Sequence, residues 1–394
     1  MSPEDQLEIL RRGCAEIISE DDLLVKLKKG KPLRVKLGVD PTAPHITLGW
    51  AVVLRKLRAV QELGHTAVLI VGDFTAMIGD PSGTSKTRPQ LTREEVMQHV
   101  ESISEQLYRI LDKEKTEIRF NGDWLMPMNF ADVIRLAGRI TVARILERED
   151  FRKRLQEQKS VGMHEILYPL CQGYDSVAIE ADVELGGTDQ KFNNLVGRNL
   201  QGQYQQEPQV VMLMPLLVGL DGKDKMSQSL GNYIGITEGP NEMFGKTMSI
   251  PDELLESWFT LCTDVPLDEV AELIKGKPRD AKVRLAREIV TIYHGEEFGR
   301  QAEDYFVRTF SKREEPIDAP DAILPDGENK FLIATLIANL GLTASAGEAR
   351  RMMEGGGVSI GGEKISDART TKTRDELDGK VLRVGKHKFR TLRK

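Results

Sequence analysis

Residues 33–50 read LRVKLGVDPTAPHITLGW, and this stretch decides the fold. Residues 33–39 alternate apolar and basic side chains up to Asp40-Pro41, which predicts a strand that ends in a loop. Residues 47–63 carry apolar side chains at helical spacing and end before Gly64, which predicts a helix. Loops after parallel strands form ligand crevices, and a helix N-terminus beside such a loop suits a phosphate. Taken alone, this loop is equally well an ordinary turn between a strand and a helix.

The alternation of strand and helix continues downstream. Residues 67–71 read AVLIV before Gly72, which predicts a buried parallel strand. The TREE sequence at 92–95 matches a capping box and predicts a helix that runs to about Asp112. Strand-like and helical segments then alternate to about residue 220. This pattern predicts an α/β domain of the Rossmann type, with a doubly wound parallel sheet.

The C-terminal part of the chain has a different character. Residues 240–310 are acidic and helix-forming, and residues 314–329 hold prolines and a glycine among acidic residues, as a linker does. Residues 329–394 show helical and then β-type patterning. They carry 14 lysines and arginines against seven acidic residues, although the whole chain has a net charge of −6. A basic module on an acidic body favours a polyanionic partner, with a solvated basic surface as the alternative.

Length and composition exclude several classes of protein. A chain of 394 residues has room for two or three domains. No apolar run reaches about 18 residues, so we expect no membrane-spanning helix, and the acidic N-terminus indicates no secretory signal. The three cysteines and six histidines lack zinc-ligand spacing, so we expect neither a protein metal site nor a disulfide framework. A reducing cytoplasm fits this cysteine usage best.

Two polar clusters mark a candidate pocket. The loop GDFTAMIGDPSG at 72–83 contains Asp80, which low in a crevice can receive a ligand ammonium. Tyr168, Gln172 and Asp175 are spaced to share one face of a helix, and we place Pro169 in its first turn. A hydroxyl, an amide and a carboxylate among apolar residues are costly to bury without hydrogen-bond partners. We therefore expect them to bind a polar ligand of amino-acid size. The alternatives are a flexible surface loop and a partly exposed helix face.

Two later loops extend this pocket. GGTDQ at 186–190 follows a strand-like segment, and KMSQS at 225–229 follows the apolar run 210–220. A loop with lysine and serine beside a nucleotide crevice can close over phosphates and stabilise developing charge. By itself the second loop is equally well a solvent loop. Neither the G-x-G-x-x-G fingerprint nor a P-loop occurs in the chain.

Taken together, these segments resemble the class I aminoacyl-tRNA synthetases, and most closely the bacterial tyrosyl-tRNA synthetases, over almost the whole chain. The segments that carry the resemblance are GVDPT at 38–42, IGDPSG at 78–83, the face formed by Tyr168, Gln172 and Asp175, GTDQ at 187–190 and the Lys-Met-Ser loop. The C-terminal module also resembles an S4 RNA-binding domain. There the motifs are SAGEARR at 345–351 and GGVSIGG at 356–362.

The resemblance implies a role for each residue of the amino-acid pocket. Asp80, Tyr168 and Gln172 would hold the ammonium of tyrosine, and Gln190 would lie near its carboxylate. Asp175 would accept a hydrogen bond from the phenol hydroxyl. This contact would discriminate against phenylalanine, because an unmatched buried acceptor is costly.

The resemblance also implies an ATP site. Gly38 and Asp40 would line the adenylate cleft, and Asp189 would bind the ribose. Thr42 would meet the γ-phosphate. The catalytic positions would be Thr42, Thr47, Gly49, Lys225 and Gln228, and Trp50 would complete the ATP site beside Thr47 and Gly49. ATP would enter with Mg²⁺, without a metal ion held by the protein.

This sequence departs from the family's signatures at the phosphates. The family's His-x-Gly-His motif is Thr47-Leu48-Gly49-Trp50 here, so both histidines are missing while Gly49 remains; His45 lies two residues before the motif. The second lysine of the Lys-Met-Ser-Lys-Ser loop is Gln228. A lysine that some relatives have after the Asp-Pro-Ser-Gly run is Thr84, with Lys86 and Arg88 nearby. We expect these losses to weaken ATP activation more than tyrosine binding.

The resemblance further implies domains and partners. A catalytic domain would cover 1–220, with a helical insertion near 125–160 that forms the face of a homodimer. A helical domain at 221–318 would contact the anticodon region, and a linker would follow at 319–328. An S4-like module at 329–394 would grip the tRNA through Arg350, Arg351 and Lys364. The partners would be tRNA(Tyr), L-tyrosine and ATP, with no membrane.

Three functions compete at this point. The first is a tyrosine–tRNA ligase with an altered ATP site. The second is a synthetase-like paralogue, weakened or inactive, that binds tyrosine or RNA without charging it. The third is a plain S4-type RNA-binding protein on an unrelated scaffold, which predicts salt-dependent RNA binding and no tyrosine binding. The intact amino-acid face favours the first.

Overall fold

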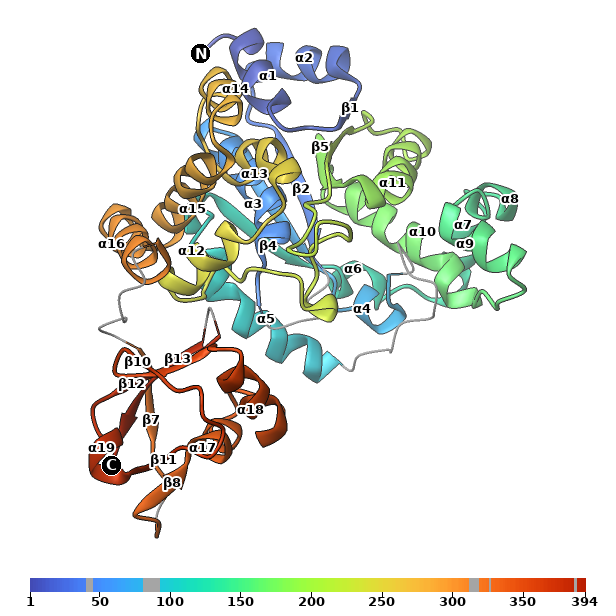
Figure 1. Cartoon of the computed structure of the whole chain (residues 1–394). Coiled ribbons are helices and arrows are strands. Elements are labelled where there is room, and N and C mark those ends of the chain that lie inside the picture. Colours follow the sequence, from blue (N-terminus) through green and yellow to red (C-terminus); the bar gives the residue numbers. More distant parts are fainter. Residues whose placement is uncertain (40–44, 81–92, 312–318, 326, 386–387) are drawn as a thin grey trace. The chain divides into compact units, whose positions relative to one another are not determined.

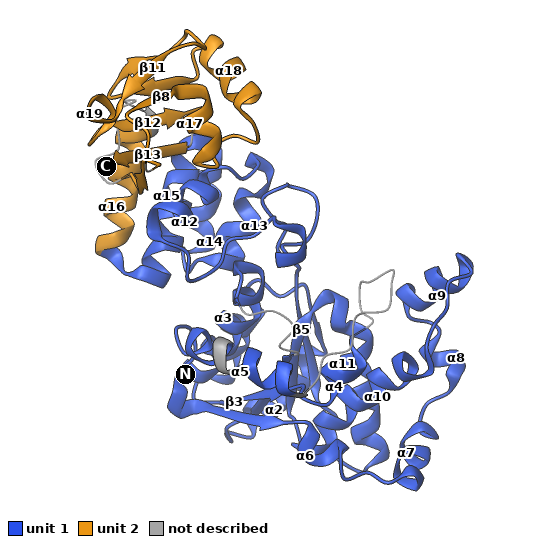
Figure 2. Cartoon of the chain, turned by 90° about the horizontal axis from the view of Figure 1, so that it is seen from below, with its two compact units in different colours: residues 1–296 blue, residues 297–394 orange. Residues whose placement is uncertain are grey.

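The computed structural model describes residues 1–39, 45–80, 93–311, 319–325, 327–385 and 388–394. Within these ranges the chain divides into two compact units, residues 1–296 and 297–394 (Figure 2). The domain boundaries expected at residues 220, 318 and 328 stay predictions. No helix in the described ranges is long and apolar enough to cross a membrane.

The first unit is built around a six-stranded sheet of the described residues, with the strand order β1-β6-β5-β2-β3-β4 (Figure 1). All neighbours are parallel except β1, which runs antiparallel to β6. The chain builds β2, β3 and β4 outward and then returns to place β5 and β6 on the other side of β2. The sheet therefore has a switch point between β2 and β5, where ligands of such folds bind. The strands are β1 (Glu16–Ile18), β2 (Arg34–Val39), β3 (Thr66–Val71), β4 (Thr116–Phe120), β5 (Val183–Gly187) and β6 (Val210–Met214).

The sequence patterns explain the elements around the switch point. The strands expected at 33–39 and 67–71 are β2 and β3, and the helix expected at 47–63 is α3 (Leu48–Glu62). Thr47 begins α3, because its hydroxyl accepts a hydrogen bond from the backbone N–H of Trp50 at 3.3 Å. The apolar side chains of α3 are buried against β2, β3 and β5. The doubly wound α/β fold expected from the sequence is confirmed.

Helix α10 (Met163–Ala178) carries the face formed by Tyr168, Gln172 and Asp175. The expectation that Pro169 lies in the first turn is wrong, because the helix begins six residues earlier. The start of the helix is stabilised by Glu165 in its first turn. The Glu165 carboxylate accepts from the backbone N–H of Gly162 at 2.7 Å and pairs with Arg154 at 2.6 Å. Pro169 is therefore in the helix interior, where it removes one backbone donor.

Helices α10 and α11 (Lys191–Gln203) pack closely beside the sheet (Figure 1). Leu170 and Val177 of α10 share a buried cluster with Val196 and Leu200 of α11. Gly173 lies at this crossing, and a Cβ there would meet Val196 and Leu200 at 3.0 Å. Glycine thus allows the close approach that positions α10. The other helices of this unit are α1 (Pro3–Arg11), α2 (Glu20–Lys28), α4 (Thr75–Ile78), α5 (Arg93–Leu107), α6 (Gly122–Leu125), α7 (Phe130–Ala137), α8 (Val142–Ile145), α9 (Glu149–Gln156), α12 (Pro240–Met248), α13 (Leu255–Cys262), α14 (Leu267–Lys275) and α15 (Pro278–His294).

The second unit combines helices with a small sheet, in the order β10-β9-β12-β13-β7. Part of the segment 319–328, expected as a linker, forms β7, which pairs with β13 in parallel. Apolar side chains from α17, α18 and the strands β9, β12 and β13 form one buried core. The elements are α16 (Glu296–Phe306), β7 (Asp321–Ile323), β8 (Lys330–Leu332), α17 (Ile333–Asn339), α18 (Ala346–Glu354), β9 (Val358–Ile360), β10 (Glu363–Lys364), β11 (Thr371–Thr373), α19 (Arg374–Leu377), β12 (Val381–Val384) and β13 (Lys388–Arg393).

Candidate active site

A pocket of about 670 Å³ opens at the switch point of the first unit's sheet. The ends of β2 and β5, with Gly38 and Gly187, form its floor together with the start of α3. The pocket collects every predicted amino-acid and ATP residue that the structure describes: Gly38, Thr47, Gly49, Trp50, Asp80, Tyr168, Gln172, Asp175, Asp189, Gln190, Lys225 and Gln228. Asp40 and Thr42 lie outside the described residues. Segments from residue 38 to residue 228 therefore meet in one cavity.

Asp175 lies at one end of this pocket and is only 2% exposed. Its Oδ1 accepts a hydrogen bond from Nε1 of Trp124 at 2.8 Å, and its Oδ2 accepts one from Nδ2 of Asn121 at 3.3 Å. Burial raises the pKa of Asp175 to about 7, against the opposing effects of Lys36 and these two donors. A buried carboxyl with lone pairs facing a cavity suits a ligand hydroxyl.

Asp80 belongs to a chain of polar side chains that also lines the pocket. Its Oδ2 accepts from Nε2 of Gln190 at 2.9 Å. Asn193 donates to Gln190 Oε1 at 3.0 Å and to Gln172 Oε1 at 2.9 Å. Arg148 in turn donates a hydrogen bond of 2.7 Å to Oδ1 of Asn193. Asp80, Gln172 and Gln190 are thereby fixed in relation to one another, and together they present polar groups to an ammonium or a carboxylate.

The predicted ATP residues line the part of the pocket between α3 and the loop 225–229. Lys225 Nζ pairs with Asp189 Oδ2 at 2.9 Å. Gln228 donates to the backbone carbonyl of His45, and the backbone N–H of Gly49 lies 3.2 Å from Sδ of Met226. A Cβ on Gly49 would meet Met226 at 3.3 Å, so glycine permits this close approach. The loop is in contact with the helix whose N-terminus can receive a phosphate.

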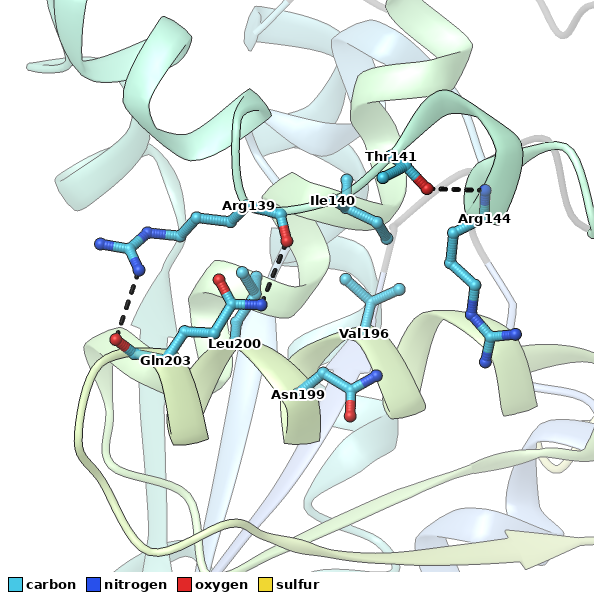
Figure 3. A pocket seen from close by; sticks show the side chains of 8 residues that line it. All are labelled: Arg139, Ile140, Thr141, Arg144, Val196, Asn199, Leu200 and Gln203. Carbon is cyan, nitrogen blue, oxygen red and sulfur yellow. Dashed lines mark hydrogen bonds between the residues drawn. The ribbon is translucent and has the colours of Figure 1, made fainter.

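A second, smaller cavity of about 320 Å³ lies between residues 139–144 and α11 (Figure 3). Arg139 donates to the Gln203 carbonyl at 3.3 Å, and the Gln203 amide donates back to the Arg139 carbonyl at 3.1 Å. The Arg139 guanidinium also lies 4.0 Å from the centre of the Tyr204 ring. No predicted site residue lines this cavity. The hydrogen bonds between Arg139 and Gln203 connect the helical segment 130–145 to α11.

Comparisons with known proteins agree with this geometry. The family model of the class I tRNA synthetases (W and Y) matches residues 28–311. A tyrosine–tRNA ligase of Moorella thermoacetica is 53% identical, over 98% of this chain and 95% of that protein. A tyrosine–tRNA ligase of Thermotoga maritima is also 53% identical, over 99% of this chain and 97% of that protein. The chain belongs to this synthetase family.

Solved structures of the family have the same fold. A C-terminally truncated mitochondrial tyrosyl-tRNA synthetase of Aspergillus nidulans aligns with a TM-score of 0.64 at 20% identity, over 78% of this chain and 94% of that chain. The tyrosyl-tRNA synthetase of Archaeoglobus fulgidus, solved in complex with L-tyrosine, aligns with a TM-score of 0.62 at 21% identity, over 76% of this chain and 99% of that chain. At this level of identity the likeness concerns the fold.

Sequence reasoning missed three residues that form hydrogen bonds with side chains of the pocket. Asn121 and Trp124 follow β4 and reach Asp175, and Asn193 on α11 links Gln172 to Gln190. The signal for the first two was their position directly after a strand, at the C-terminal edge of the sheet. Asn193 carried no signal, since a single asparagine in a helix is most often a surface residue; here it is 1% exposed.

The predicted RNA-binding residues lie in the second unit. Arg350 and Arg351 are on α18, and Lys364 is on β10; all three side chains are exposed. Ala349 and Met353 of the same helix are buried in the core of the unit, so they hold the helix in place. An exposed pair of arginines on a fixed helix can contact phosphates, and their role stays a prediction.

Proposed function

We propose that this chain is a tyrosine–tRNA ligase, which activates L-tyrosine with ATP to tyrosyl-adenylate and transfers the amino acid to tRNA(Tyr). The observation that carries the proposal is a single pocket that holds the carboxylates of Asp80 and Asp175 with Tyr168 and Gln172. Relatives named tyrosine–tRNA ligase, 53% identical over nearly the whole chain, support it. We find no observation that favours a binding module without catalysis.

In this proposal tyrosine lies with its ring tip at Asp175. The phenol O–H donates to the carboxylate, whose other contacts are Trp124 and Asn121. Phenylalanine would offer this buried carboxylate no donor in place of the phenol O–H, which supports discrimination of about 10⁴- to 10⁵-fold. Asp80, Tyr168 and Gln172 receive the ammonium, and Gln190 lies near the carboxylate.

The first reaction joins the tyrosine carboxylate to the α-phosphorus of ATP and releases pyrophosphate. The residues here act by positioning and by stabilising charge rather than by moving protons. Asp189 is placed to bind the ribose and Gly38 to border the adenylate, while Lys225 supplies a cation to the phosphates. ATP brings Mg²⁺, which neutralises phosphate charge. Asp40 and Thr42 belong to this proposed site by sequence. In the second reaction the tRNA 3′ end attacks the tyrosyl carbonyl and releases AMP.

The proposal includes an altered ATP site. Thr47 uses its hydroxyl to cap α3, and Trp50 has no cation to offer at the second signature position. Gln228 contributes an amide where a lysine would contribute a charge. Each missing donor removes about 2.7–4 kcal/mol of transition-state stabilisation if nothing replaces it. His45 lines the same pocket and is exposed, so it is the residue placed to compensate.

We also infer a homodimer through the helical segment near 125–160. Large apolar side chains are exposed there and at the start of α10: Met126, Phe130, Ile134, Val142, Leu155 and Met163. Phe130 is 79% exposed and Met163 is 71% exposed. So many large apolar side chains are unusual on a surface that stays in contact with water. In a two-fold symmetric dimer, the same apolar residues of a second copy of the chain would pack against them.

The tRNA is the remaining partner in the proposal. The basic module of residues 329–394, with Arg350, Arg351 and Lys364 exposed, supplies positive charge for the RNA backbone. The helices of 221–318 would contact the anticodon region. The cytoplasm is the proposed location, since Cys14, Cys171 and Cys262 are free thiols that suit a reducing compartment.

Exchange of radioactive pyrophosphate into ATP tests the proposal. We expect exchange that depends on tyrosine and on none of the other standard amino acids. Tyrosine binding without exchange at high enzyme concentration would replace the ligase with a binding module. Exchange driven best by another amino acid would overturn the assigned substrate.

A further inference from the structure

Lys36 is an ion buried in the middle of the sheet, directly behind the amino-acid pocket. It is 0% exposed, although the basic and apolar alternation of β2 gave no sign of burial. Its Nζ donates to the Gln172 backbone carbonyl at 2.9 Å and to Ser176 Oγ at 2.8 Å. The third partner is Glu184 Oε1 at 2.9 Å. All three ammonium protons are therefore used within the fold.

Glu184 is as deeply buried as Lys36 and is its direct partner in the sheet. The two residues stand side by side in the parallel register of β2 and β5. The second oxygen of Glu184 accepts from Ser176 Oγ at 3.1 Å and from the amide of Gln209. A buried pair is stable only when its remaining hydrogen bonds are satisfied, and here they are.

The pair acts on the part of α10 that carries the pocket residues. Two of the three Lys36 bonds end on residues 172 and 176, and these bracket Asp175 along the helix. Titratable groups that interact with Asp175 include Lys36 on β2, Glu184 on β5 and Cys171 on α10. The pKa of Cys171 is raised to about 12 by burial, so this thiol stays neutral. Lys36 is then the cation that balances two buried carboxylates.

We propose that Lys36 is a positioning residue for amino-acid specificity, which fixes residues 172–176 of α10 against the sheet and keeps Asp175 a carboxylate that accepts the ring-tip hydroxyl of the ligand. This inference rests on the proposed function. Without the Lys36 charge, Asp175 would retain its proton at neutral pH. A protonated Asp175 no longer requires a donor from the ligand, and the preference for tyrosine over phenylalanine falls.

Two variants that differ only at residue 36 test the proposal: Glu184→Gln, and Glu184→Gln combined with Lys36→Met. Neither leaves a glutamate buried without its cation. The measurements are tyrosine and phenylalanine affinities across a pH series, and the tyrosine-over-phenylalanine ratio of kcat/KM in exchange.

With Glu184→Gln alone, one negative charge near Asp175 is gone, so the midpoint of tyrosine binding moves to lower pH than in the wild type. With Lys36→Met added, the midpoint moves up by about one pH unit from that of Glu184→Gln, and the specificity ratio at neutral pH falls about tenfold. A general loss of structure would weaken both ligands equally and would not move the midpoints in opposite directions.

Equal midpoints and equal ratios in the two variants overturn the role of Lys36. If the double variant does not fold, Glu184→Gln combined with Lys36→Gln takes its place, and a midpoint equal to that of Glu184→Gln alone overturns the proposal. A wild-type protein without tyrosine-dependent exchange is a different outcome, since it removes the proposed function itself.

Discussion

The indole N–H of Trp124 donates to the carboxylate of Asp175 at 2.8 Å, across 51 positions of sequence. This bond joins the segment after β4 to α10 at the pocket. It leaves Asp175 as an acceptor that is oriented before any ligand arrives. Such an acceptor favours a ligand with one hydroxyl at its tip, because a hydrogen bond lost in a buried site is not replaced by water.

Burial of this acceptor has a consequence for stability. The pKa of Asp175 is raised by burial from 3.8 to about 7, so between these values the folded protein keeps a proton that the unfolded chain releases. Stability therefore falls as the pH rises through this window, by up to about 1.4 kcal/mol per pH unit. We expect the Tm of the wild type to decline between about pH 4 and 7 relative to Asp175→Asn and to level off above this range. Calorimetry measures the two curves.

The control for this titration is Glu253→Gln, which changes an exposed carboxylate. Its Tm should follow that of the wild type at each pH. Parallel curves for the wild type and Asp175→Asn would contradict a buried titration at residue 175.

The proposed ATP site predicts a gain of activity from a change in the loop 225–229. Gln228→Lys places a cation on the proposed phosphate side of the pocket, where charge would develop as pyrophosphate leaves. We expect kcat of tyrosine-dependent exchange to rise about tenfold with little change in the KM for tyrosine. Gln98→Lys adds the same charge at an exposed site of α5, outside the pocket, and should have no effect. A drop in kcat with Gln228→Lys would show that the amide is the better group here.

The exposed arginines of α18 predict a separation of the two reactions. In the variant Arg350→Glu with Arg351→Glu, tRNA charging should fall by at least about tenfold at physiological salt, because phosphate contacts become repulsions. Tyrosine-dependent exchange should stay at the wild-type rate, which also shows that the first unit is intact. Charging of tRNA at an unchanged rate would remove these residues from the RNA site.

The apolar surface near 125–160 predicts association. Phe130→Asp places a charge on a side chain that is 79% exposed, so it should leave folding unchanged and shift sedimentation from dimer to monomer. Leu267→Asp is the matched control, since Leu267 is exposed on α14 outside this segment. A monomeric wild type, or a dimer that survives Phe130→Asp, contradicts the inferred interface.

Local patterns were sufficient to predict the elements that build the pocket. The alternation in 33–39, the helical spacing in 47–63 and the apolar run at 67–71 correspond to β2, α3 and β3. Each element was predictable because the spacing of apolar side chains differs between strands and helices. The spacing of Tyr168, Gln172 and Asp175 likewise predicted one helix face, and the structure places all three in one pocket.

Contacts between segments that are distant in the sequence could not be predicted from local patterns. Lys36 is in a strand whose pattern reads like a half-exposed one, and only the pairing of β2 with β5 gives it Glu184 as a partner. Pro169 was expected at a helix start because proline is tolerated there, yet the ion pair of Arg154 and Glu165 begins the helix earlier. The burial of Lys36 and the start of α10 both depend on contacts between side chains, and a local sequence pattern does not show which side chains will be in contact.

The central claim is that the pocket between Asp80 and Asp175 is built for tyrosine, and binding calorimetry tests it most directly. Tyrosine and phenylalanine are titrated into the wild type and into Asp175→Asn near pH 8, where Asp175 is ionised. We predict that the wild type strongly prefers tyrosine and that the variant loses most of this preference. Equal affinity of the wild type for both amino acids would contradict the account.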